Sequence, residues 1–338
     1  MGEVTKISWC HHTFNPWRGC TKVSAGCTHC YAETMSKRNP AVLGEWGPEG
    51  KRAMAAEPYW RQPFAWDRAA EKAGERRRVF CASLADVFED RPELVAPRTR
   101  LFDTIASTPH LDWLLLTKRP ENIIRLWPGT TVPNRPMVAI NGHRVFPNVW
   151  LGVSAENQQE LVRRAWELLS IPAAVRFLSL EPLLGPVDTE EPELLCDAWR
   201  RGGTIGTYLD WVIVGGESGP KARPFDVAWA RSVVTQCREA GVPCFVKQLG
   251  ARPMMRADST EGRRIGDHPE REWPVGTLFG TSPDQMGTEW QGRWAHARAP
   301  YEGGRCVGRP VPFDRAGADP EEWPEDLRVR EFPEVRRG

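Results

Sequence analysis

The chain has 338 residues, which is long enough for one α/β barrel, and 41% of them are hydrophobic, so a large core can form without disulfide bonds. Its 45 basic and 44 acidic residues nearly cancel, and this balance does not favour direct binding to long DNA. No stretch is apolar enough to span a membrane and no N-terminal run resembles a signal peptide, so we expect a cytoplasmic protein.

The first predicted strand lies near residues 7–9 or 13–17, and a cysteine-rich loop follows it. Cys20, Cys27 and Cys30 have the spacing C-x6-C-x2-C, and the last two are predicted to open the next helix. Thiolates on a loop and at a helix N-terminus are stabilised by backbone N–H groups and by the helix dipole, which lowers their pKa. In a cytoplasmic protein, such clustered thiols indicate metal binding or catalysis rather than disulfide bonds.

Short apolar runs recur along the rest of the chain, and each ends in a polar or glycine-rich stretch. Continuous apolar runs of this length suit strands that are buried on both faces of a parallel sheet. The predicted strands span residues 78–83, 111–117, 149–154, 175–180, 209–214 and 243–247. The spacing of apolar residues predicts helices over 156–170 and 226–241, the second between Asp226 as N-cap and Gly241 as stop signal.

Strands that alternate with helices predict βα units. With the first strand, the predicted strands number about seven, which favours a partial or complete (β/α) barrel over residues 1–250. A doubly wound sheet is the competing architecture. Residues 251–338 show little periodicity and are predicted to form an irregular covering segment that ends in a C-terminal arm over 319–334.

The three cysteines favour one of two metal sites. Three thiolates can hold three irons of a 4Fe–4S cluster and leave the fourth iron open to another ligand. The alternative is a structural zinc, with Cys10 or one of His11, His12 and His29 as the fourth ligand. The cysteines follow the first strand, where a barrel carries its active site, and this position favours the iron–sulfur cluster.

Four segments of the chain carry a resemblance to a known family. They are NPWRGCTKVSAGCTHCYAE at 15–33, SLEPLLG at 179–185, VGGES at 214–218 and FVKQ at 245–248. In these segments the chain resembles a phage-type family of radical S-adenosylmethionine-like proteins with a three-cysteine motif and no assigned substrate. The resemblance implies a partial (β/α) barrel, a 4Fe–4S cluster, S-adenosylmethionine, and a phage- or prophage-encoded protein in the host cytoplasm.

The chain departs from the general radical enzyme pattern at two places. The usual spacing is C-x3-C-x2-C, and here the first two cysteines are separated by six residues. The usual Gly-Gly-Glu follows the second strand, where this chain has Ser83-Leu-Ala-Asp86. Its own Gly215-Gly-Glu217 comes on a much later strand.

Polar side chains at the strand ends are the candidate ligands for S-adenosylmethionine, because a barrel delivers them to one mouth. Carboxylates there can pair with the amine and ribose of the cofactor, and hydroxyl, amide and amine groups can contact its carboxylate and base. The candidates are Ser83, Asp86, Lys118, Ser154, Glu156, Asn157, Glu181, Glu217 and Lys247. Helix capping is the alternative role for the serines. Arg119, next to Lys118, is also delivered to this mouth, and a solvated loop charge is the alternative for both.

The resemblance implies reductive cleavage of S-adenosylmethionine, followed by hydrogen abstraction from a small-molecule or nucleotide substrate, with an electron donor as partner. One alternative is a phage-associated enzyme that modifies nucleotides or DNA bases by the same chemistry. The other alternative is a zinc-stabilised binding protein without catalysis. Metal analysis of anaerobically purified protein discriminates between iron and zinc.

Overall fold

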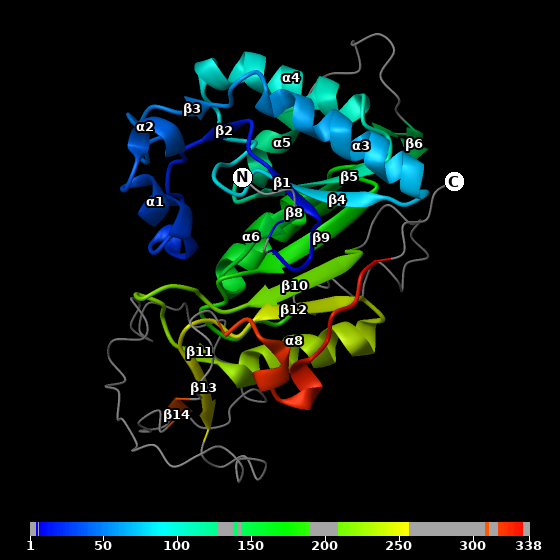
Figure 1. The fold of residues 1–338 in the computed structure, drawn as a ribbon. Coiled ribbons are helices and arrows are strands. Elements are labelled where there is room, and N and C mark those ends of the chain that lie inside the picture. Colours follow the sequence, from blue (N-terminus) through cyan, green and yellow to red (C-terminus); the bar gives the residue numbers. More distant parts are fainter. Residues whose placement is uncertain are drawn as a thin grey trace.

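The computed structural model describes residues 5, 7–127, 138–140, 143–189, 209–256, 308–310 and 317–333. Its centre is one seven-stranded β-sheet that curls into an open half-barrel (Figure 1). The strands of this sheet are β1 (His12–Phe14), β4 (Arg77–Cys81), β5 (Leu111–Thr117), β8 (Val149–Ser154), β9 (Val175–Leu180), β10 (Trp211–Gly215) and β12 (Cys244–Gln248).

The seven strands lie in the sheet in their chain order, and every neighbouring pair is parallel. A doubly wound sheet reverses its strand order at one point, so the competing architecture is wrong. In the part of the chain that the structure describes, β1 and β12 are the two edges and do not pair with each other. The sheet is therefore a partial barrel and not a complete one.

The longer helices cover the outer face of the half-barrel (Figure 1). They are α3 (Gln62–Ala73), α4 (Val95–Ala106), α6 (Gln158–Leu169) and α8 (Val227–Ala240). α8 has the predicted ends: the Asp226 carboxylate accepts a hydrogen bond from the Ala228 N–H, and Gly241 takes a φ of 67°. Buried residues of these helices, such as Leu101 and Val233, share one core with alternate residues of the strands.

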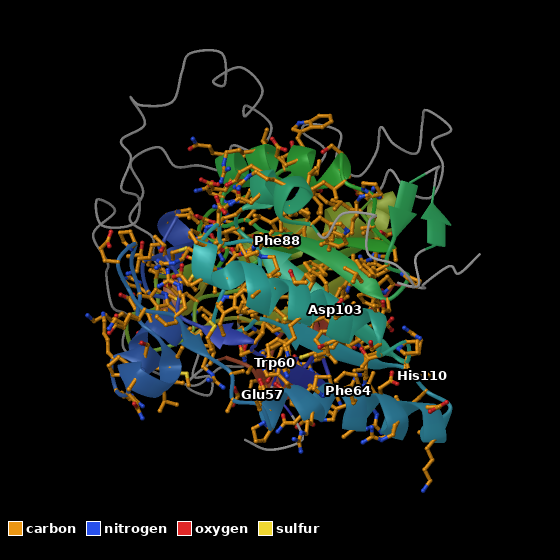
Figure 2. The ribbon with its side chains drawn as sticks, turned by 90° about the horizontal axis from the view of Figure 1, so that it is seen from above. Glu57, Trp60, Phe64, Phe88, Asp103 and His110 are labelled. Carbon is orange, nitrogen blue, oxygen red and sulfur yellow. The ribbon has the colours of Figure 1, made fainter. Side chains whose placement is uncertain are left out.

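Polar and aromatic contacts join α3 to α4 at one end. Glu57 and Trp60 precede α3, and both are labelled in Figure 2, which looks onto these two helices. Arg100 of α4 forms an ion pair with Glu57 at 2.5 Å and lies 4.4 Å from the centroid of the Trp60 ring. The Glu57–Arg100 pair is exposed, whereas Trp60 is buried and belongs to the core beneath the two helices.

Large aromatic side chains fill the inner face of the half-barrel. Trp150 of β8, Phe177 of β9, Trp211 of β10 and Phe245 of β12 belong to one buried cluster that contains no helix residue. Gly152 makes room for Phe177 opposite it, since a Cβ atom at position 152 would lie 2.3 Å from that ring. These rings fill the interior of the half-barrel below the carboxyl ends of its strands.

The C-terminal arm (residues 317–333) runs along the free edge of β12. The Val246 N–H donates a hydrogen bond to the Val329 carbonyl at 2.9 Å. Near the end of the arm, Phe332 packs against the inner aromatic cluster, and the Arg78 guanidinium lies 3.9 Å from the centroid of its ring. Because Arg78 belongs to β4, the arm connects the two sides of the half-barrel. The predicted covering segment lies largely outside the described residues.

The remaining helices and strands are short, and none of the described helices is both long and apolar enough to cross a membrane. The short strands are β2 (Trp17–Arg18), β3 (Ala53–Met54), β6 (Val138–Ile140), β7 (His143–Val145), β11 (Phe225–Asp226), β13 (Pro253–Arg256) and β14 (Gly308–Pro310). The short α-helices are α1 (Tyr31–Ser36), α2 (Pro40–Leu43) and α5 (Ile123–Leu126), and single 3-10 turns span Ala25–Cys27, Tyr59–Arg61, Pro92–Leu94, Pro120–Asn122, Pro320–Glu322 and Glu325–Leu327.

Candidate functional site

The cysteine loop (residues 19–30) crosses the carboxyl edge of the sheet, which we call the mouth. The loop contacts residues that closely follow four strands: Leu84 after β4, Arg119 after β5, Glu156 after β8 and Glu217 after β10. One loop thus spans most of the mouth, where parallel barrels carry their active sites.

The three cysteines of this loop differ from the other cysteines in their exposure. Cys20 follows β2, Cys27 ends the 3-10 turn, and Cys30 is the N-cap of α1. All three thiols are free and half-buried, whereas the other cysteines that the structure describes are free and buried. The partly exposed cysteines of the described chain are therefore gathered on one loop.

The side chains of Cys20, Cys27 and Cys30 are chemically suited to bind a metal, because free cysteines on one segment are typical ligands for zinc and iron–sulfur clusters. Among the described residues, however, no group of three or more His, Cys, Asp or Glu side chains is arranged to hold a metal ion. A metal shared by Cys20, Cys27 and Cys30 therefore requires the three sulfur atoms to lie closer together than they do here.

The zinc alternative needs a fourth ligand, and three of its candidates have other partners. Cys10 belongs to the buried cluster of the inner face. The Nδ1 atom of His11 accepts a hydrogen bond from the Arg78 N–H at 2.8 Å. The ring of His12 is stacked on the Trp66 ring at a centroid distance of 4.3 Å. These contacts do not favour any of the three as a metal ligand.

Two buried arginines hold the first part of the cysteine loop. Arg119 Nη1 lies 3.7 Å from Cys20 Sγ and 2.9 Å from Asp86, and its Nη2 donates to the Thr21 carbonyl at 2.5 Å. Arg52 Nη2 donates to Thr21 Oγ1 at 2.9 Å, while its guanidinium makes two hydrogen bonds of 2.8 and 2.7 Å to the Glu89 carboxylate. The segment at Thr21 is therefore held from two sides.

Glu156 holds the second part of the loop from the end of β8. Its Oε1 accepts a hydrogen bond from the Gly26 N–H at 2.9 Å, and its Oε2 pairs with Arg164 at 2.9 Å. Both side chains of this ion pair are fully buried. Burial acts to raise the pKa of Glu156, but hydrogen bonds from the loop and the Arg164 charge outweigh it, and they hold this pKa below its ordinary value.

Glu217 holds the same part of the loop from the end of β10. Its carboxylate pairs with Arg223 at 2.7 Å and with His29 Nδ1 at 3.2 Å, and Arg223 also donates to the Ala25 carbonyl at 3.1 Å. Burial acts to raise the pKa of Glu217, but the hydrogen bonds from Arg223 and His29 outweigh it and hold this pKa below its ordinary value.

An accessible ion pair lies at the mouth beyond the loop. Glu181 Oε1 accepts hydrogen bonds from Lys247 Nζ at 2.5 Å and from Gln248 Nε2 at 3.1 Å. The Tyr31 hydroxyl donates to the Ser83 carbonyl at 2.6 Å, and 47% of the tyrosine surface stays exposed. This part of the mouth offers a cation, an anion and a fixed aromatic ring to a ligand.

Several predicted ligands are engaged within the protein. Asp86 is buried and accepts the Arg119 hydrogen bond, and Ser154 donates to the Glu181 carbonyl at 3.0 Å. Asn157 caps α6 by accepting a hydrogen bond from the Glu160 N–H. For these side chains the contacts are structural, and a role toward a cofactor stays a prediction, as it does for Lys118, whose backbone N–H bonds to Asp86.

Burial changes the chemistry expected for one thiol. Burial is the largest influence on Cys20 and raises the pKa of its thiol to about 12, although the nearby Arg119 charge acts in the opposite direction. The prediction of a lowered pKa is therefore wrong for Cys20. It does not lie at a helix N-terminus, and the buried carboxylates of Asp86 and Glu89 also oppose its ionisation.

Arginines hold the site together, and of these only Arg119 was among the strand-end residues expected at the mouth. Arg52, Arg119, Arg164 and Arg223 each bind a carboxylate at the mouth, and three of them also bond to the cysteine loop. The position of Arg119 just after the predicted strand over 111–117 indicated it. The other three arginines carry no such local signal.

Comparisons with known proteins identify a family and one distant structure. A family with the description "Protein of unknown function (DUF5131)" matches residues 4–299. No curated protein matches the chain. A solved structure of a spore photoproduct lyase mutant, with bound AdoMet and dinucleoside spore photoproduct, is similar with a TM-score of 0.35 and 12% identity. The match covers 60% of this chain and 54% of that chain, so the chain spans about half the length of that structure.

Proposed function

The chain belongs to the DUF5131 family, whose description assigns no function, and we propose that it is an iron–sulfur enzyme of the radical S-adenosylmethionine type. The observation that carries the proposal is the presence of three free, half-buried thiols on one loop across the mouth of a parallel half-barrel. Three thiolate ligands leave one iron of a 4Fe–4S cluster open, which suits a cofactor that must bind to iron.

The proposed metal ligands are Cys20, Cys27 and Cys30. When bound there, a 4Fe–4S cluster supplies the electron for cleavage of a carbon–sulfur bond in S-adenosylmethionine. Glu156 accepts a hydrogen bond from the Gly26 N–H, and Glu217 contacts the His29 side chain, so both carboxylates support the loop near Cys27 and Cys30.

The ion pair of Glu181 and Lys247 is the proposed contact for the amino-acid part of S-adenosylmethionine. A zwitterionic group carries both an ammonium and a carboxylate, and each can exchange for one partner of this half-buried pair. The exposed Tyr31 ring lies beside the last cysteine and offers a flat apolar surface. The buried aromatic cluster on the inner face of the half-barrel excludes water from the interior, so cofactor and substrate would meet at the mouth.

The first test is the metal content of anaerobically reconstituted protein. We expect about four irons and about four sulfides per chain in the wild type. Cys20→Ala, Cys27→Ala and Cys30→Ala should each lose most of the iron. The matched control is Cys10→Ala, which should keep it because Cys10 is buried in the inner cluster and not on the loop. Iron and sulfide analysis, together with the visible absorption spectrum, measures both quantities.

Two results would contradict the proposal. Stoichiometric zinc without iron after anaerobic reconstitution would favour a zinc-stabilised protein without this chemistry. A full cluster in protein that neither binds S-adenosylmethionine nor releases 5′-deoxyadenosine on reduction would remove the enzyme class while leaving the metal site.

A further inference from the structure

Two lysines at the mouth differ from the other lysines of the chain in their burial. Among the described residues, Lys118 and Lys247 are the only half-buried lysines, and the others are exposed. Lys118 directly follows β5, whereas Lys247 belongs to β12. Leu116 and Phe245, each two residues earlier, pack in the inner aromatic cluster. Because successive side chains alternate between the two faces of a sheet, both lysines are placed on the inner side of the mouth.

Only one of these two lysines has a carboxylate partner. Lys247 Nζ lies 2.5 Å from Glu181 Oε1. In the described part of the chain, Lys118 forms no ion pair and its side chain donates no hydrogen bond. Its backbone N–H donates to Asp86 Oδ2 at 3.2 Å, so the residue itself is held in place. Lysine side chains are seldom buried without a partner, and a half-buried, unpaired ammonium therefore indicates an anionic ligand.

The carboxylates nearby are engaged by other cations. Burial acts to raise the pKa of Glu156, and the Lys118 charge is among the influences that lower it, so this ammonium lies near the end of β8. Glu156 Oε2, however, pairs with Arg164 at 2.9 Å. Asp86 Oδ2 pairs with Arg119 at 2.9 Å. Neither carboxylate can turn to Lys118 without weakening the ion pair of a buried arginine.

We propose that Lys118 binds a phosphate group of the substrate at the mouth. The anion site stands on the burial and the missing partner of Lys118, whereas its assignment to the substrate rests on the proposed function. In that function the ion pair of Glu181 and Lys247 takes the amino-acid part of S-adenosylmethionine, so Lys118 is left for a second molecule.

The chemistry of the ammonium favours phosphate at this position. The sulfonium and ammonium of S-adenosylmethionine outweigh its one carboxylate, so this cofactor brings no net negative charge to Lys118. A phosphate monoester carries about 1.5–2 negative charges near neutral pH. Lysine binds phosphate as a compact point charge, whereas the planar fork of arginine matches a carboxylate, and four carboxylates of the mouth do pair with arginines.

The test asks whether methyl phosphate protects Lys118 from acetylation in iron-free wild-type protein. Acetic anhydride modifies unprotonated lysine amines, and mass spectrometry of the digested protein gives the rate at each lysine. With methyl phosphate at about ten times its dissociation constant, the rate at Lys118 should fall about tenfold. Lys72, an exposed lysine of α3, is the internal control and should react at an unchanged rate. Sodium acetate at equal ionic strength should protect Lys118 much less.

A second measurement compares Lys118→Gln with Lys72→Gln, which remove the same charge from the protein. In a phosphorus NMR titration, the affinity for methyl phosphate should fall about tenfold in Lys118→Gln and stay unchanged in Lys72→Gln. Equal protection of Lys118 by acetate would rule out phosphate as the ligand class. Absent protection in the wild type, or equal affinity in both variants, would overturn the site.

These outcomes are independent of the metal, because both measurements use iron-free protein. A failed anion site leaves the proposed function standing if the reconstituted wild type takes up iron. Protection of Lys118 in a chain that takes up no iron would keep the anion site and overturn its assignment to the substrate.

Discussion

Asp86 stands at the centre of a hydrogen-bond network at the ends of β4 and β5. Its carboxylate accepts from the backbone N–H of Phe88 at 2.9 Å and of Lys118 at 3.2 Å. It also accepts from Thr117 Oγ1 at 2.8 Å and from Arg119 Nη1 at 2.9 Å. A buried carboxylate with this many donors has little capacity left for a ligand, so its main role is to hold the loops around it.

Replacing this carboxylate should therefore affect folding first. We expect Asp86→Asn to lose about 1.5–3 kcal/mol of unfolding free energy, because the amide cannot accept all of these hydrogen bonds and loses the charge opposite Arg119. Urea denaturation of the unloaded protein measures the loss. A variant of wild-type stability with weakened S-adenosylmethionine binding would instead place Asp86 at the cofactor.

For Glu181 we expect the opposite of Asp86, namely an effect on cofactor binding rather than on stability, because Glu181 is partly exposed at the mouth. We expect Glu181→Gln to keep the iron content and to change the unfolding free energy by less than about 1 kcal/mol, because its partner Lys247 remains partly solvated. The affinity for S-adenosylmethionine should fall roughly tenfold to a hundredfold, measured by calorimetry on the reconstituted protein. Unchanged affinity would remove Glu181 from the cofactor site.

Glu217 gives the cysteine loop a dependence on pH. Its pKa is held below the ordinary 4.5, so its carboxylate adds stability that is fully present above about pH 4.5 and is lost as the pH falls through the lowered pKa. Wild type should exceed Glu217→Gln in urea midpoint at about pH 7, and this advantage should shrink at about pH 3.5. An equal advantage at both pH values would contradict the role of the ionised carboxylate.

The packing of β8 against β9 requires a glycine on one strand opposite a phenylalanine on the other. Gly152 and Phe177 lie opposite each other, and a Cβ atom at 152 would lie 2.3 to 2.6 Å from three carbons of the Phe177 ring. The ring is fully buried among other aromatic side chains, so it has little room to move. The absence of a side chain at Gly152 therefore leaves room for the Phe177 ring between β8 and β9.

Gly152→Ala should destabilise the sheet through this contact. We expect a loss of about 1–3 kcal/mol of unfolding free energy, as for other insertions into a packed core. Gly185→Ala is the control: a Cβ atom there meets nothing within 4 Å, so a change within about 0.5 kcal/mol is expected. If both variants were equally stable by urea denaturation, the packing of Phe177 against position 152 would be looser than described.

At the scale of the whole molecule, the C-terminal arm completes the open side of the half-barrel. An open parallel sheet exposes unpaired backbone groups along its edge strands. The arm pairs with the β12 edge through Val246 and Val329, and through Cys244 and Glu331. Its last described aromatic residue, Phe332, adds to the inner cluster, so the last part of the chain stabilises strands formed much earlier.

Phe332→Ala tests how much the arm contributes. We expect a loss of about 2 kcal/mol of unfolding free energy, below the roughly 3–5 kcal/mol of a fully buried phenylalanine, because Phe332 is only partly buried. Glu325→Ala, at an exposed position of the same arm, should change it by less than about 0.5 kcal/mol. The iron content should be unaffected by Phe332→Ala, because Phe332 packs against the inner aromatic cluster and not on the cysteine loop.

Local apolar runs were enough to predict most strands of the sheet and their parallel arrangement. The predicted bounds of β5, β8 and β9 equal the observed ones, because a continuous apolar run is a local signal that buried strands require. The cap and stop of α8 were local signals of the same kind. α3 and α4 were not predicted, since buried charged side chains such as Asp67 and Arg98 interrupt their apolar faces.

Local sequence patterns did not predict where the sheet ends or which residues hold the cysteine loop. Whether β1 meets β12 depends on curvature summed over the whole sheet, which no local pattern encodes. Arg119 lies 99 positions from Cys20, and Arg223 lies 198 positions from Ala25. Such contacts form only after distant strand ends meet at one edge of the sheet. The cysteine spacing can therefore be read from the sequence, whereas the contacts of the arginines that hold the cysteine loop cannot.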